Sequence, residues 1–88
     1  MSPRFRYRPE VLAALAEFGL APRPATAPES VRVWLRDLYN FELREANHRF
    51  REANRVLGPQ PIEIQRQRVA ALRGRYWLLS LPVDRWVT

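Results

Sequence analysis

The sequence contains a direct repeat of seven residues, in which Arg44-Glu45-Ala46-Asn47 is followed by Arg51-Glu52-Ala53-Asn54. The repeat lies in a stretch, residues 28–57, that no Gly and no internal Pro interrupts. A spacing of seven keeps each residue type on a fixed side of an α-helix. Ala46 and Ala53 therefore share one stripe of the helix, and Asn40, Asn47 and Asn54 share another. This pattern constrains how a long helix packs, and it carries no chemistry by itself.

Pro and Gly divide the chain into three predicted helices. Residues 9–18 begin at a Pro, carry apolar residues at helical spacing and stop at Gly19, which predicts a short first helix. Thr26 and Glu29 have the spacing of a capping box, so we expect them to start a second helix at residues 28–57.

The third predicted helix covers residues 62–79. Gly58-Pro59-Gln60-Pro61 separates it from the second, and Pro82 follows it. Gly74 disfavours its last turns by about 1 kcal/mol relative to Ala. The remaining residues, 80–88, form a short tail.

The second and third helices have apolar stripes that match when the chain folds back at residues 58–61. Both stripes follow alternating spacings of three and four. Small residues then oppose larger ones across the interface between the two helices, here called the seam. Gln65 is the one polar residue in it. The predicted pairs are Leu57 with Ile62, Ala53 with Gln65, Phe50 with Val69, Ala46 with Leu72, Leu43 with Tyr76, and Tyr39 with Leu79.

The fold class is therefore all-α: a short N-terminal helix packed on a long antiparallel hairpin. We expect one helical domain, residues 1–88, with a basic arm at 1–8, a helical core at 9–79 and a tail at 80–88. The start of the second helix is apolar nearly all round, so it needs cover on every side. The first helix and the tail are the available covers, and any surface that they leave bare is expected to be a dimer interface.

Composition excludes several functional classes. A chain of 88 residues forms a small domain, in which a deep active site is not expected. The absence of Cys excludes disulfide scaffolds, thiolate metal sites and Cys nucleophiles, and it suits a reducing compartment, so we expect a cytoplasmic protein. Apolar runs are too short to span a membrane, and the N-terminus does not resemble a signal peptide.

The net charge of +6 favours binding to nucleic acid, because clustered cations release counterions from phosphates. All 15 basic residues are Arg, however, which a GC-rich coding bias also produces. The excess is concentrated in residues 1–9 and 62–79. Either a binding function or the base composition of the genome can account for this excess of Arg.

No catalytic constellation is apparent. Glu45 and His48 have the Glu-x-x-His spacing of carboxylate-bridged metal sites, but such a site needs a second copy of the motif and the chain has one His. Gly-rich phosphate loops are also absent. We therefore expect no enzyme activity, no metal and no cofactor.

Two surfaces are candidates for binding. The first is a ladder of Arg and Asn side chains on the second helix, expected to face away from the seam and able to bind phosphates or carboxylates of a partner. The alternative is an ordinary solvated helix face. With Trp77, which is off the seam, the predicted partner-binding residues are Arg44, Asn47, Arg51, Asn54, Arg55 and Trp77.

The second surface is the basic arm, where Phe5 and Tyr7 alternate with Arg residues. Its aromatic side chains can stack on bases or, alternatively, dock on the helical core. We predict a non-catalytic protein interaction module or assembly subunit, with a homodimer as one option. The alternative is an RNA- or DNA-binding accessory protein that uses Arg4, Arg6, Arg8, Arg66, Arg68, Arg73 and Arg75.

Overall fold

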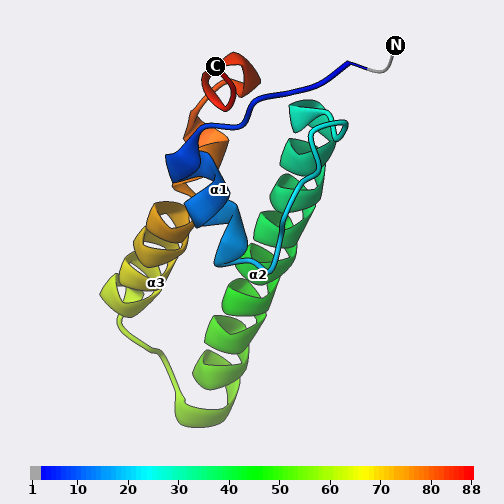
Figure 1. Ribbon diagram of the computed structural model, residues 1–88. Helices are drawn as coiled ribbons and strands as arrows, with labels where there is room; N and C mark the ends of the chain where they lie inside the picture. The colour runs from blue at the N-terminus through cyan, green and yellow to red at the C-terminus, as the bar shows by residue number, and fades with distance from the viewer. Residues whose placement is uncertain (1–2) are drawn as a thin grey trace. The chain divides into compact units, whose positions relative to one another are not determined.

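The computed structural model describes residues 3–88 and is all-α. It contains the helices α1 (Pro9–Ala16), α2 (Pro28–Leu57) and α3 (Ile62–Arg75), followed by the 3-10 helices η1 (Trp77–Ser80) and η2 (Val83–Arg85) (Figure 1). No strand occurs within these residues, although Tyr7 and Val87 form an isolated antiparallel bridge. The predicted fold class, with its antiparallel hairpin of α2 and α3, is confirmed.

The chain divides into two compact units. Residues up to Arg36 and Leu78–Thr88 form the first, here called the terminal unit, and Asp37–Trp77 form the second, the hairpin unit. Helix α2 runs through both. The arm and the tail, at opposite ends of the sequence, thus belong to the same unit.

The terminal unit contains most of the buried apolar side chains. Trp86 is fully buried, and its indole Nε1–H donates to the carbonyl oxygen of Leu78 over 3.3 Å. The buried residues of α1 and those at the start of α2 belong to this same unit. Helix α1 and the tail therefore cover one side of α2, as expected. The core residues are Tyr7, Val11, Ala14, Leu15, Val31, Leu35, Leu78 and Trp86.

The arm is bound to the tail through its backbone. The Arg8 N–H donates to the Trp86 carbonyl over 2.9 Å, and the Thr88 N–H donates to the Arg6 carbonyl over 2.9 Å. The buried Tyr7 donates its hydroxyl to the carbonyl of Thr26 over 2.5 Å. Of the two alternatives for the arm, docking is therefore the one observed for Tyr7.

The predicted ends of two helices are wrong by a few residues. Helix α1 ends at Ala16 and not at residue 18, because the chain turns through Gly19, whose φ of 74° belongs to the left-handed region. Helix α3 ends at Arg75 and not at residue 79. Gly74 weakens the last turn, and burial of Tyr76 and Leu78 in different units outweighs helix continuation.

The capping box predicted at Thr26 and Glu29 is also wrong. Helix α2 begins at Pro28, and Thr26 lies two residues before it. The Thr26 hydroxyl accepts a hydrogen bond from the Arg23 N–H over 3.2 Å, and the Thr26 N–H donates to the Arg23 carbonyl over 2.9 Å. Thr26 therefore closes a turn in the connector.

The hairpin unit has a thin core. Within Asp37–Trp77, Gln65 and Tyr76 are buried, whereas the predicted seam residues Phe50 and Val69 are half-buried. Leu57 is 74% exposed and Ile62 is exposed as well, so the predicted pair at the end of the hairpin does not form a buried contact. Residues 58–61 separate the helix ends, and the apolar stripes of this unit remain partly open to solvent.

Candidate functional site

The Arg and Asn ladder predicted on α2 is not a single outward face. Asn47 and Asn54 are directed into the hairpin: Asn47 Oδ1 accepts a hydrogen bond from Gln65 Nε2 over 2.6 Å, and Asn54 Oδ1 accepts one from the Gln60 N–H over 2.7 Å. The prediction that these amides face away from the seam is therefore wrong. Both lie at the border of the apolar stripe, where a short amide can turn inward to satisfy buried polar groups.

The remaining residues of that prediction are exposed. Arg44 and Arg51 lie on the polar side of α2. Arg55 forms an ion pair with Glu52 over 2.9 Å, and this hydrogen bond lowers the pKa of the Glu52 carboxyl. Trp77 is partly exposed at the start of η1. The cationic surface of α2 is thus made by Arg side chains without the amides.

Contacts of the seam also depart from the predicted pairing. Gln65 contacts Asn47, six residues before its predicted partner Ala53. Tyr76 donates its hydroxyl to Glu42 and packs edge-on against Tyr39, with ring centroids 5.3 Å apart. Polar and aromatic side chains therefore form these contacts across the hairpin.

The basic residues proposed for nucleic acid are divided between the two units, with those of the arm in the terminal unit and those of α3 in the hairpin unit. In the arm, Arg4 and Arg6 are exposed and Arg8 is half-buried, with its Nε donating to the Val87 carbonyl over 3.4 Å. The burial of Tyr7 removes one of the two aromatic rings that base stacking would use.

The four Arg residues of α3 occupy two flanks. At 100° per residue, Arg66 and Arg73 lie on one side of the helix, and Arg68 and Arg75 lie on roughly the opposite side. Arg66 pairs with Glu63 over 2.8 Å, and Arg75 pairs with Glu42 over 3.1 Å. These four side chains therefore leave α3 on two opposite flanks, and two of them are paired with Glu.

Apart from Trp77, the side chains that sequence reasoning missed are the exposed apolar ones of the hairpin unit. Phe41 is 54% exposed and Val56 is 64% exposed. The sequence pattern identified the apolar stripes but did not show which members lack cover. The large apolar residues exposed in this unit are Phe41, Val56, Leu57, Ile62, Ile64 and Trp77.

A groove lies between α2 and α3 within the hairpin unit. Phe41, Ala46 and Leu72 supply its apolar surface. Glu45 borders it on α2, together with Arg49 one turn further on, and Arg68 borders it on α3. The groove is thus an apolar strip with charges of both signs at its border.

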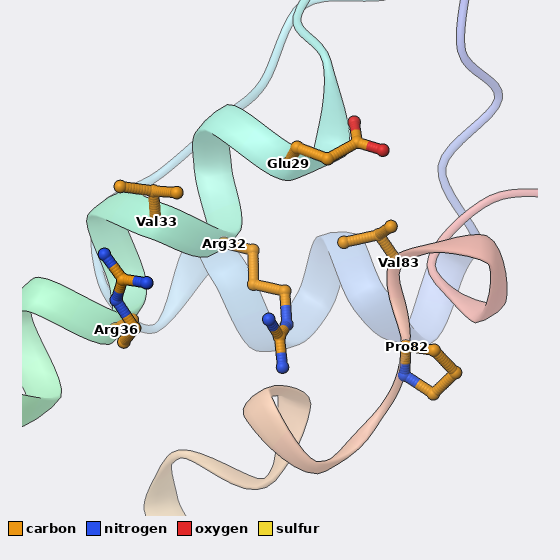
Figure 2. A pocket seen from close by; sticks show the side chains of 6 residues that line it. All are labelled: Glu29, Arg32, Val33, Arg36, Pro82 and Val83. Atoms are coloured by element: carbon orange, nitrogen blue, oxygen red, sulfur yellow. The ribbon is translucent and has the colours of Figure 1, made fainter.

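A second hollow, of about 400 Å³, occurs in the terminal unit (Figure 2). Arg32 extends from α2 toward the chain after α3, and its Nη2 donates to the Leu79 carbonyl over 3.1 Å. Its Nε is buried and has no hydrogen-bond partner among the described residues. Val33, Pro82 and Val83 supply apolar lining. Arg32 therefore links α2 to η1 through this hydrogen bond. Its side chain has a structural role in the hollow.

The amide pair at the centre of the hairpin allows a test of its polar contact. Gln65 is 8% exposed, and its Oε1 has no hydrogen-bond partner among the described residues. We expect Asn47→Ala to destabilise the protein by about 1–3 kcal/mol, because it leaves both polar atoms of the buried amide unpaired. The Asn47→Leu/Gln65→Leu double variant should be close to the parent in stability, because it removes both partners.

Urea unfolding of the single and double variants measures this difference. A double variant that is less stable than Asn47→Ala would contradict the assigned contact.

The environment of Tyr76 predicts a dependence of stability on alkaline pH. Burial and the hydrogen bond to Glu42 raise the pKa of the Tyr76 phenol above its ordinary value near 10. The stabilisation is fully present below about pH 10, where the phenol of the unfolded chain is also neutral, and is lost as pH rises toward the folded pKa. Urea unfolding above and below about pH 10 should show this loss, and Tyr76→Phe should reduce it. An equal loss in both proteins would contradict this assignment.

No helix in residues 3–88 has the length and apolar character needed to cross a membrane. Within the same residues, no three His, Cys, Asp or Glu side chains are grouped so that they could hold a metal ion. The chain matches no protein-family model, no curated protein and no solved structure with which it was compared.

Proposed function

We propose that this protein is a non-catalytic protein interaction module or assembly subunit that binds through the hairpin unit. The observation that carries this proposal is the imbalance between buried and exposed apolar residues in that unit. Tyr76 is its one buried aromatic residue among those described, while Phe41, Val56 and Ile64 are exposed. Exposed apolar clusters on small proteins typically mark interaction surfaces.

The chemistry of this surface suits another protein. Aromatic anchors such as Phe41 and Trp77 are enriched at protein interfaces, where their burial supplies much of the binding free energy. The exposed Glu45, Arg49 and Arg68 border the groove that Phe41 lines and can form a polar rim. Burial of apolar area contributes roughly 25 cal/mol per Å², and this term depends little on salt.

Binding to RNA or DNA is less well supported. The arm uses Tyr7 internally, and the Arg residues of α3 are divided between two flanks and partly paired with Glu. A nucleic-acid complex would lose affinity steeply with added salt, because bound cations displace counterions from phosphates.

A photo-crosslinking side chain at Val56 tests the proposal, with the same side chain at Arg44 as the matched control on α2. We expect covalent protein adducts from Val56 in extracts of the native cells, fewer from Arg44, and similar yields at low and high salt. Intact mass and peptide sequencing identify each adduct. Absence of protein adducts from Val56, or adducts that contain nucleic acid, would contradict the proposal.

A further inference from the structure

The groove of the hairpin unit has an ordered charge distribution. Arg75 contacts Glu42 and Gln65 contacts Asn47, so α3 runs antiparallel to this part of α2. Arg68 and Leu72 line the groove on α3, and because the two helices are antiparallel, Arg68 is the one of the two nearer the end that holds Arg49. Glu45 lies nearer the other end. The groove consequently has an acidic end and a basic end with Phe41, Ala46 and Leu72 as its apolar part.

The charged side chains at the two ends of the groove form no polar contact with the rest of residues 3–88. Among residues 3–88, Glu45, Arg49 and Arg68 have no hydrogen bond or ion pair from their side chains. All three are exposed. This contrasts with Glu42, which is engaged by Tyr76 and Arg75. The three free charges are thus available to a partner.

The outer side of α2 has the symmetry that self-association requires. At 100° per residue, Leu38, Glu45, Arg49 and Val56 lie within about 40° of one another around the helix. Leu38 and Val56 are equally distant from position 47 in sequence, and so are Glu45 and Arg49. A second α2 laid antiparallel about position 47 would therefore place apolar against apolar and acid against base. A two-fold interface needs this self-complementarity, whereas contact with an unrelated protein does not.

We infer that the partner of the hairpin unit is a second copy of this chain, docked antiparallel across the groove. Glu45 of each protomer faces Arg49 and Arg68 of the other, and Leu38 of each faces Val56 of the other. The inference rests on the proposed interaction function and specifies its partner.

Charge exchange tests this arrangement. The Arg49→Glu/Arg68→Glu variant has two acidic ends, and the Glu45→Arg variant has two basic ends. Each alone should dimerise at least about tenfold more weakly than the parent, because like charges meet at both ends. A mixture of the two should form a heterodimer, since each acidic end then meets a basic one. The triple variant Glu45→Arg/Arg49→Glu/Arg68→Glu should regain self-association.

Sedimentation equilibrium of the full chain measures these affinities, and circular dichroism of each variant verifies that it is folded. A parent protein that remains monomeric, or folded charge variants that associate with parental affinity alone or fail to associate when mixed, would overturn the inference. The crosslinking experiment separates this failure from failure of the proposed function. Adducts at Val56 that contain a different protein would leave the interaction function supported and the self-association wrong.

Discussion

Replacing Trp86 by Ala is expected to destabilise the protein by about 3–5 kcal/mol. Trp86 has 0% exposure, and its truncation would leave a large cavity in the buried core of the terminal unit. It would also remove the donor to the Leu78 carbonyl. Native proteins have a total stability of about 5–15 kcal/mol, so this loss is a large fraction of the total and should lower the urea unfolding midpoint markedly.

Trp34→Ala is the matched control for Trp86→Ala. Trp34 lies in the same unit on α2 and is 45% exposed, so its removal should destabilise the protein by less than about 1.5 kcal/mol. Urea unfolding followed by far-ultraviolet circular dichroism compares the two variants. Equal unfolding midpoints would show that Trp86 is not the centre of the core.

The second large effect is expected for Tyr76→Ala in the hairpin unit. Tyr76 is 3% exposed, contacts the ring of Tyr39 and donates to Glu42. Truncation of a buried aromatic residue typically destabilises a protein by about 3–5 kcal/mol. Because the rest of this unit is at most half-buried apart from Gln65, we expect α3 to lose its protection against amide hydrogen exchange.

Tyr76→Phe separates the ring from its hydroxyl. It keeps the packing against Tyr39 and removes the donor to Glu42, which retains its ion pair with Arg75. The expected destabilisation is only about 1 kcal/mol at neutral pH. If Tyr76→Phe and Tyr76→Ala destabilise the protein to a similar extent, the hydroxyl, and not the buried ring, stabilises the hairpin.

Local sequence signals determined the elements of this fold well where Pro and Gly are placed unambiguously. The bounds of α2, Pro28 and Leu57, agree with the prediction, because Pro favours the first helical turn and Gly58 adopts a φ of 88° after the last one. The C-terminus of α3 could not be located in this way. Burial of Tyr76 and Leu78 overrides local propensity there.

The candidate site was harder to predict from the sequence than the helices. Helical phase identifies an apolar stripe about 100° wide, but it does not show whether other residues of the chain cover that stripe. Leu57 and Ile62 fit the seam pattern and are nevertheless exposed. The inward direction of Asn47 depends on the position of Gln65 on the facing helix, which a repeat within α2 alone does not encode.

The ring contact between Tyr39 and Tyr76 permits the most direct test of the hairpin on which the proposed surfaces depend. Isotope-filtered nuclear Overhauser spectra of a mixture of labelled and unlabelled chains distinguish contacts within one molecule from contacts between two. We predict a cross-peak between these two rings, 5.3 Å apart, within a single chain. Absence of that intramolecular cross-peak in the folded protein would contradict the pairing of α2 with α3 and, with it, the groove and its exposed apolar surface.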